Sequence, residues 1–365
     1  MMYHILLSRD FDLEGIEREA QAGKRPRHVI WNLSQTLGAT VHVPTNDPLT
    51  LFDWLCSKII GQPEQWALAR RLVSQLTEHD TVFCLGEDVG FALAILCKFK
   101  GKRPKLAVSV MAPYRRRVRR LLKFFRLSDQ IDLFAVNTQI KATYIRDYLQ
   151  LSGDRIYQQP EQTDIRFFNP GAAQPKTRPL VVSAGLEQRD YQTLATATQA
   201  LDVDVKICAV SPNASAKTKV VFPKVMPDNM ASRHYDWSEF LQLYRDADVV
   251  VVSLLWNNYS AGLTTLIEAM ACRRPVVMTR TPGLADELIN LGLVTGVEAG
   301  DAAGLQHAIT HLLEHPEVAA QQAEAAYARI LSEHTSEYYV ESMIAQLQQL
   351  GNVPQPESFA APLPA

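Results

Sequence analysis

The most constraining feature of the sequence is a run of four valines, Val249–Val252. The run is continuously apolar and β-branched, which is typical of a strand buried on both faces. Such strands occur in parallel sheets that are covered by helices, because parallel strands need crossover connections. The run therefore predicts an α/β domain, and the loop that follows it is expected to lie at the carboxyl edge of the sheet, where α/β proteins bind ligands.

Short apolar runs alternate with helical patterns along most of the chain, which is the α/β signature. The alternation breaks in a turn-rich stretch between Gln159 and Pro175, which is expected to be a linker, and it restarts at Leu180. Because 365 residues are long for one domain, two domains are expected. The predicted parts are domains over 1–175 and 176–335, a last helix over 336–351 and a disordered tail over 352–365.

Composition excludes several classes of protein. The net charge of −2 indicates neither a nucleic acid nor a membrane as the partner of the whole chain. The five cysteines are scattered and form no Cys-x-x-Cys pair, so a zinc site is not expected and a reducing, cytoplasmic compartment fits best. The sequence has no apolar stretch of about 18 residues that would span a membrane and no signal-peptide pattern at its start.

The loop and helix after the valine run carry the clearest chemistry. Gly262 allows close approach of the backbone to a phosphate, and the free amides of a helix N-terminus favour an anion. Thr264 and Thr265 add hydroxyl donors, and Glu268 lies about one turn further, where a carboxylate can accept two hydroxyl hydrogen bonds from a ribose. The alternative is a capped turn with a surface acid that complements the helix dipole.

Residues 260–277 resemble the signature of the family 4 glycosyltransferases, in which a glycine-containing loop precedes Leu-Glu-Ala-Met-Ala and then Pro-Val-Val. The segment 183–194 resembles the opening segment of the same family, with Arg189 at its basic phosphate-binding position. Thr281-Pro282-Gly283 resembles a later glycine turn, and the segment 164–170 resembles the end of the family's N-terminal domain. Several motifs thus fall in the order that the family shows, over roughly residues 180–335.

The resemblance implies a GT-B fold, with two Rossmann-like domains facing a central cleft and a last helix that crosses back to the first domain. It implies a retaining, metal-independent hexosyltransferase that uses a nucleoside diphosphate sugar such as a UDP-sugar, with no cofactor. The basic residue, here Arg189, would neutralise the leaving diphosphate. Glu268 would hold the ribose. The residues expected at the donor are Arg189, Ser260, Ala261, Gly262, Leu263, Thr264, Thr265 and Glu268.

Three positions depart from the family pattern. Ser260 stands where the family has a first Glu that contacts the transferred sugar, so this contact is expected from a hydroxyl or the backbone. Arg273 replaces the usual glycine before Pro-Val-Val, and a left-handed backbone is less favourable for arginine than for glycine. The family's His near the reacting carbon is absent close to Met111. Glu87 and Asp88 are therefore candidate catalytic acids on the acceptor side, and their alternative is a pair that favours a helix N-terminus.

A basic segment marks the N-terminal half, because residues 89–128 contain twelve Lys and Arg and no acid. An apolar and a basic stripe lie on nearly opposite faces of the helix expected here. The basic stripe predicts attachment to an anionic membrane or capture of an anionic acceptor, and the alternative is a solvated face over a buried apolar stripe. No aromatic stacking pattern suggests a nucleic acid. The predicted patch is Arg115, Arg116, Arg119, Arg120 and Lys123.

These observations predict a retaining glycosyltransferase that moves a hexose from a nucleoside diphosphate sugar to an acceptor such as a membrane lipid. The expected location is cytoplasmic, with peripheral attachment to the inner face of a membrane. Two alternatives remain open. One is an inactive protein that binds nucleotide sugars, and the other is a GT-B sugar-nucleotide epimerase or hydrolase, which would need further acids near the anomeric carbon.

Overall fold

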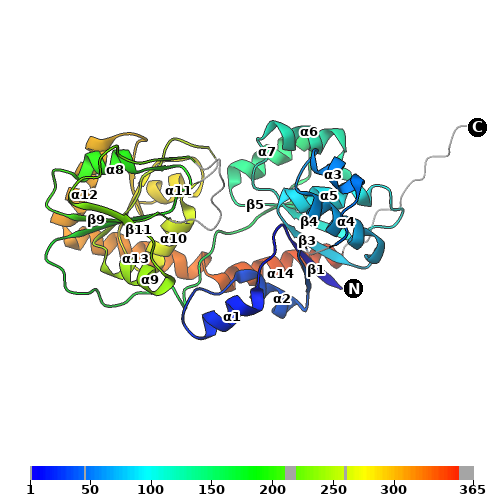
Figure 1. Ribbon diagram of the computed structural model, residues 1–365, viewed down its shortest axis with the longest axis horizontal. Coiled ribbons are helices and arrows are strands. Elements are labelled where there is room, and N and C mark those ends of the chain that lie inside the picture. Colours follow the sequence, from blue (N-terminus) through cyan, green and yellow to red (C-terminus); the bar gives the residue numbers. More distant parts are fainter. Residues whose placement is uncertain (1, 45–46, 210–218, 259–260, 353–365) are drawn as a thin grey trace, which may run out of the picture. The chain divides into compact units, whose positions relative to one another are not determined.

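The computed structural model describes residues 2–44, 47–209, 219–258 and 261–352. These residues form two compact units, each built around a six-stranded parallel sheet (Figure 1). Unit 1 takes residues from 1–14, 29–159 and 340–365, and unit 2 takes 15–28 and 160–339. The chain therefore passes between the units four times. The predicted tail, apart from Asn352, lies outside the described residues.

Unit 1 has the strand order β2-β1-β3-β4-β5-β6, and all neighbours are parallel. The order reverses between β1 and β3, which makes this pair the topological switch point of the sheet. Its strands are β1 (Tyr3–Leu7), β2 (Thr40–His42), β3 (Thr81–Leu85), β4 (Lys105–Ser109), β5 (Leu133–Val136) and β6 (Ile156–Gln158). Its α-helices are α2 (Val29–Leu37), α3 (Leu51–Ser57), α4 (Pro63–Gln75), α5 (Glu87–Cys97), α6 (Arg116–Phe124) and α7 (Gln139–Leu149). The short 3-10 helices are η1 (Leu127–Asp129) and η2 (Gly153–Arg155).

Unit 2 has the strand order β11-β9-β7-β12-β13-β14, again all parallel, with the switch point between β7 and β12. The strands are β7 (Leu180–Ala184), β9 (Asp204–Cys208), β11 (Met230–Arg233), β12 (Val249–Val252), β13 (Val276–Thr279) and β14 (Thr295–Val297). A small second sheet pairs β8 (Arg189–Asp190) with β10 (Val220–Val221). The helices are α8 (Tyr191–Thr198), α9 (Trp237–Asp246), α10 (Leu263–Ala271), α11 (Leu284–Asn290), α12 (Ala302–Glu314) and α13 (Pro316–Glu333).

The valine run forms a strand that is buried on both faces of the sheet, as its composition predicts. Val249 and Val251 pack into the cluster formed with α8 and α12, whereas Val250 and Val252 pack into the cluster formed with α9, α10 and α13. Both faces of the sheet are covered by helices (Figure 1). All four valines are fully buried, which is why no polar residue interrupts the run.

The predicted linker differs from what the structure shows. Residues 160–175 belong to unit 2, not to the N-terminal part of the chain. Phe167 and Phe168 are buried in the core of unit 2, and Thr163 pairs with Thr335 in an isolated parallel bridge. Aperiodic sequence can pack well when single aromatic residues fill gaps in a core, and periodicity does not detect this.

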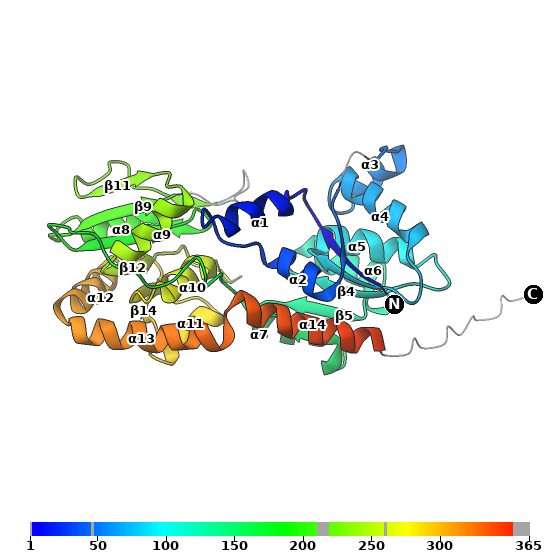
Figure 2. The ribbon, with the colours of Figure 1, turned by 90° about the horizontal axis from the view of Figure 1, so that it is seen from below.

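Two elements connect the units along the chain. Helix α1 (Leu13–Gln21) starts at the end of the first stretch of unit 1 and continues in unit 2. Helix α14 (Ser336–Asn352) starts in unit 2 and continues in unit 1 as one uninterrupted helix (Figure 2). The sequence predicts α14 over 336–351, and it predicts no helix at α1.

Candidate functional site

The candidate site lies at the switch point of unit 2. A pocket of about 560 Å³ opens beside the carboxyl ends of β7 and β9 and the N-terminus of α10. Ligands of doubly wound sheets bind in this place because the loops diverge there and leave a crevice. The lining residues are Arg25, Ala184, Gly185, Leu186, Glu187, Arg189, Cys208, His234, Tyr235, Asp236, Trp237, Phe240, Gly262, Thr264, Thr265 and Glu268.

Arg189 supplies a buried positive charge to this pocket. Its Nε donates to the carbonyl of Ala184 at 2.6 Å, Nη1 donates to the carbonyl of Glu187 at 2.9 Å, and Nη2 donates to the Thr265 hydroxyl at 3.0 Å. The side chain is only 3% exposed, and burial lowers its pKa below the ordinary value. Three neutral acceptors fix the guanidinium without neutralising it, so the charge is available to an anion in the pocket.

Two glycines make room for this guanidinium. Gly185 and Gly262 both have left-handed backbones, with φ of 93° and 86°. A Cβ at Gly185 would lie 2.5 Å from Nη2 of Arg189. At Gly262 it would lie 2.7 Å from Cγ1 of Val252 and 3.4 Å from Nη1 of Arg189. The close approach of backbone to the cation therefore requires glycine at position 185, whereas the left-handed backbone and the Val252 side chain require it at position 262.

The N-terminus of α10 forms the wall next to Arg189. Gly262 is the N-cap, and Thr264 and Thr265 line the pocket. Ala261 and Leu263 do not line it, because both side chains are buried in the core of unit 2. Their contribution is therefore limited to backbone groups. Ser260 lies outside the described residues. The predicted donor residues Arg189, Gly262, Thr264, Thr265 and Glu268 are thus brought together in one pocket.

Glu268 is a buried acid in this pocket. It is 8% exposed, and Oε2 accepts a hydrogen bond from the Tyr244 hydroxyl at 3.0 Å. Burial raises the pKa of Glu268 to about 8, although the Tyr244 hydrogen bond and the charge of Arg189 act in the opposite direction. The acid is therefore not a solvated surface residue of the helix, which was the alternative to a ligand-binding role.

Aromatic side chains line the other part of the pocket, and the sequence did not predict them. Tyr235, Trp237 and Phe240 come from the start of α9 and the turn before it, with His234 beside them. The ring centroids of Phe240 and Tyr244 are 4.6 Å apart, and those of Trp237 and Phe240 are 6.4 Å apart. The signal that could have identified this region is the capping box of Asp236 and Glu239, which places these rings at a helix start.

Arg273 has the left-handed backbone that is expected where the signature usually has glycine. Its φ is 56°, in the left-handed region, directly after the C-cap of α10. Its side chain forms an exposed ion pair with Glu324. A non-glycine residue in this conformation carries a strain of about 1–2 kcal/mol.

The predicted acceptor-side acids lie in unit 1, at its switch point. Glu87 follows β3 and opens α5, and its Oε2 accepts from the amide of Met111 at 2.9 Å. Burial raises the pKa of Glu87 and of Asp88, and the charge of Arg115 lowers both. Glu87 thus links the loops after β3 and β4. This contact supports the structure of the two loops.

The basic helix is α6. Its apolar residues Val118, Leu121 and Leu122 are buried in the core of unit 1. The patch residues Arg115, Arg116, Arg119, Arg120 and Lys123 are exposed. The apolar stripe is therefore buried, as the structural interpretation predicts, and α6 exposes its basic face together with Phe124, which is 79% exposed. Arg119 and Lys123 lie over the ring of Tyr148, at 5.2 Å and 4.6 Å from its centroid.

Neither a spanning helix nor a metal centre is found in the part of the chain that the structure describes. No described helix is both long and apolar enough to cross a bilayer. Within the same residues, no three His, Cys, Asp or Glu side chains are grouped as ligands for a metal ion. None of the five cysteines is joined in a disulfide bond in the described residues.

Comparison with known proteins agrees with this architecture. Residues 193–345 match the sequence model of a family described as glycosyl transferase-like. Over 100 residues the chain is 33% identical to glycogen synthase from Mycobacterium tuberculosis, and this stretch is 27% of the chain and 23% of that enzyme. The matched region therefore spans about a quarter of the curated relative.

Two solved structures resemble the chain over nearly its full length. Sucrose-phosphate synthase from Thermosynechococcus elongatus has a TM-score of 0.70 at 16% identity, covering 96% of this chain and 99% of that chain. HepE from Anabaena, solved in complex with UDP-glucose, has a TM-score of 0.64 at 16% identity, covering 96% and 100%. At such identities the likeness establishes the fold. The chain therefore has the GT-B fold, and its residues 193–345 are similar to the glycosyl transferase-like family.

Proposed function

We propose that the protein is a retaining hexosyltransferase of the family 4 type, which transfers a sugar from a nucleoside diphosphate sugar to an acceptor. The observation that carries this proposal is the content of one pocket. It combines the buried Arg189 cation, a glycine-opened helix N-terminus, the buried acid Glu268 and an aromatic wall. These groups match the diphosphate, the ribose and the base of one ligand.

The chemistry follows from charge development. As the bond between the anomeric carbon and the diphosphate oxygen breaks, negative charge grows on the leaving diphosphate. Arg189 and the amides at the start of α10 stabilise that charge, and they need no reorganisation because Arg189 is already fixed. The acceptor oxygen bonds to the anomeric carbon on the face that the diphosphate leaves, and its proton passes to a diphosphate oxygen. This route uses neither a metal nor a cofactor.

Glu268 is the proposed ribose ligand. Its Oε2 already accepts from Tyr244, which orients the carboxyl group within the pocket. A ribose diol would supply two further donors, and hydrogen bonds to the ionised carboxylate favour the charged form that burial disfavours. Because HepE was solved with UDP and with UDP-glucose, UDP-hexoses are the first donors to test.

The acceptor is proposed to lie on an anionic membrane surface. The exposed cations of α6 are one part of the observation. The other part is α3, where Leu51, Trp54 and Leu55 are 76%, 55% and 54% exposed. Arg117 of α6 donates to backbone carbonyls at the end of α3, so the two helices are neighbours within unit 1. We propose that α3 enters the bilayer interface while α6 contacts the anionic headgroups.

The five cysteines form no disulfide bond in the described residues, which supports placing the protein on the cytoplasmic side, where thiols stay reduced. The competing function is binding of nucleotide sugars without transfer. An epimerase remains the other enzymatic alternative, and it would convert the donor sugar without an acceptor. Release of free nucleotide from a panel of UDP- and GDP-sugars, with and without lipid acceptors, identifies the transferase, and conversion of the donor sugar without an acceptor separates the epimerase from the inactive protein. Acceptor-dependent release supports the transferase, and binding without release or conversion supports the inactive protein.

Calorimetry tests the donor site directly. We expect the wild-type protein to bind UDP or GDP and Glu268→Ala to bind roughly 10- to 100-fold more weakly, since hydrogen bonds to a charged group are lost. Glu317→Ala is the matched control, because Glu317 is an exposed acid of the same unit. Absence of binding by the wild type at millimolar nucleotide would refute the donor site.

A further inference from the structure

The segment 15–28 contributes to the pocket from an unexpected part of the chain. It lies between β1 and α2, both of which belong to unit 1, yet its own contacts place it in unit 2. It contains most of α1 and ends just before Val29. Two of its arginines have defined partners in unit 2, and together they indicate a role for the segment.

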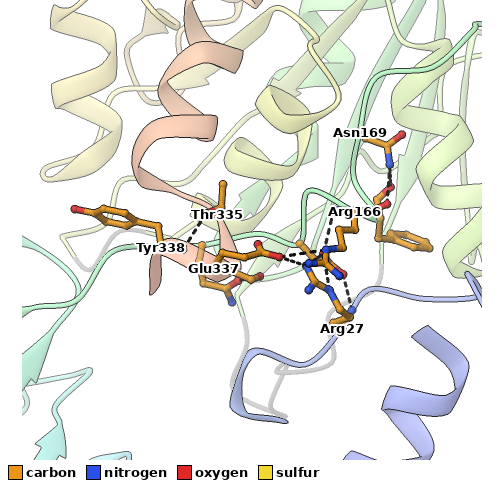
Figure 3. A network of polar contacts seen from close by, with 10 residues as sticks. Arg27, Arg166, Asn169, Thr335, Glu337 and Tyr338 are labelled. Atoms are coloured by element: carbon orange, nitrogen blue, oxygen red, sulfur yellow. Dashed lines mark hydrogen bonds and ion pairs between the residues drawn. The ribbon is translucent and has the colours of Figure 1, made fainter. Parts of the chain in front are cut away.

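Arg27 binds the segment 15–28 to the rest of unit 2. Its backbone amide donates to Oδ2 of Asp164 at 2.8 Å, and its Nε donates to Oδ1 at 3.0 Å. Its Nη2 donates to Oε1 of Glu337 at 2.9 Å. Figure 3 shows the Glu337 carboxylate between the guanidinium groups of Arg27 and Arg166. The side chains of Arg27 and Asp164 are 12% and 3% exposed, so this ion pair is largely removed from solvent.

The partners of Arg27 are themselves anchored in unit 2. Oδ1 of Asp164 also accepts from the backbone amide of Arg166 at 3.1 Å. The neighbouring residue Thr163 pairs with Thr335, two residues before Glu337. The clasp formed by Arg27, Asp164 and Glu337 is therefore attached to ordered backbone on both sides, and it fixes where the preceding residues of the segment lie.

Arg25 lies two residues before the clasp and lines the pocket. Its guanidinium carbon is 5.7 Å from the centroid of the Trp237 ring. Its Nη1 pairs with Glu19 at 3.2 Å, whereas its Nε is buried without a hydrogen-bond partner among the described residues. An arginine that stacks on an indole and retains an unused donor is suited to bind an acceptor atom of a ligand.

A series of contacts leads from Arg189 to Arg25. Arg189 bonds to Thr265, and Glu268 follows one turn later on α10. Glu268 bonds to Tyr244, whose ring packs on Phe240. Phe240 packs on Trp237, and the guanidinium group of Arg25 lies over the ring of Trp237. In a nucleotide the base follows the ribose. If Arg189 binds the diphosphate and Glu268 binds the ribose, the nucleobase is therefore expected at the other end of this series of contacts, beside Trp237 and Arg25.

We propose that Arg25 is a specificity residue that donates a hydrogen bond to a carbonyl oxygen of the donor's nucleobase. The inference rests on the proposed nucleotide-sugar function and deepens it. Uracil and guanine carry a carbonyl where adenine carries an amino group, so a fixed arginine favours the first two and opposes the third. The segment 15–28 is then the element that sets base preference.

Calorimetry with UDP, GDP and ADP on the full chain tests this proposal. We expect the wild type to bind UDP or GDP roughly tenfold more tightly than ADP, as one well-placed arginine contact predicts. Arg25→Ala should bring the affinities for UDP, GDP and ADP close together. Lys24→Ala is the matched control, because it removes an equal charge from an exposed neighbour that does not line the pocket.

The outcomes are distinguishable. Loss of base preference in Arg25→Ala and its retention in Lys24→Ala support the proposal. An equal loss of affinity for all three nucleotides overturns it, because Arg25 would then contact the phosphate or the ribose. Unchanged affinities in Arg25→Ala also overturn it. If the wild type binds no nucleotide, the proposed function fails first, and Arg25 has no base to contact.

Variants of the clasp provide a second test of the proposal. Arg27→Ala should release the segment and thereby reproduce the loss of base preference, although Arg27 does not line the pocket. Arg166→Ala is its control, since Arg166 contacts Glu337 at 3.3 Å but is 72% exposed and lies outside the segment. Trypsin cleavage after Lys24 should become faster in Arg27→Ala only, because the Arg25–Pro26 bond resists trypsin. Retained base preference in a chain cleaved at this segment would contradict the role of Arg25.

Discussion

At the scale of single residues, the ionisation of Glu268 makes the stability of the folded protein depend on pH. Its folded pKa of about 8 lies above the ordinary value of 4.5, because burial disfavours the charged form. The folded protein therefore keeps this proton over a pH range in which the unfolded chain has lost it. The contribution of Glu268 to stability accordingly falls as pH rises from the unfolded pKa towards about 8.

This direction gives a prediction for Glu268→Gln, which cannot ionise. The variant should be more stable than the wild type at pH 8.5 and close to it at pH 5, and urea unfolding at both pH values measures this. Glu317→Gln, an exposed acid in the same unit, is the control. A stability difference that does not change with pH would exclude ionisation of Glu268 as its cause.

Gly262 gives the second prediction at this scale. Gly262→Ala combines a left-handed backbone with a Cβ 2.7 Å from Val252. We expect the strain to cost about 1 kcal/mol and the overlap a further 1–3 kcal/mol. Gly292→Ala separates the two effects, because Gly292 has φ of 72° but nothing within 4 Å of the added Cβ. Thermal unfolding should show the larger loss in Gly262→Ala, and nucleotide binding should weaken only there.

At the scale of elements, α6 and α3 carry the membrane proposal. Arg119→Ala/Arg120→Ala should reduce flotation with vesicles that contain anionic lipid, since each basic residue near such a surface contributes about 1 kcal/mol. Lys206→Ala/Lys224→Ala is the matched control, with the same change of charge on exposed residues of unit 2. Trp54→Ala should weaken binding to the same vesicles through lost insertion. Equal recovery with neutral vesicles would remove the proposal.

Elements differ in how well the sequence predicts them. Strand β12 is predicted with the bounds that the structure shows, because continuous burial leaves an uninterrupted apolar run. Helix α3 is not predicted, since its apolar residues face outward and give no amphipathic pattern. The donor motif on α10 is found because its residues are contiguous. Arg25 is not found, because no local pattern shows that a residue 212 positions before Trp237 lies over its ring.

At the scale of the whole molecule, the clasp is the feature with the largest expected effect on stability. Arg27→Ala leaves Asp164 buried without its cationic partner, which should cost about 3–5 kcal/mol. Arg166→Ala removes an exposed pair and should cost less than about 1 kcal/mol. Urea unfolding of both variants measures the difference. Similar small losses in both would show that Asp164 reaches solvent when Arg27 is absent.

The four crossings of the chain also bear on how the protein is made. Arg27 leaves the ribosome well before its partner Glu337, which follows 310 residues later. At about 5–20 residues per second, the segment 15–28 waits about 15–60 s before its clasp can close. Unit 1 likewise needs the last turns of α14. Neither unit can therefore be completed before Glu337 and the last turns of α14 have been made, so both units acquire their final contacts almost together.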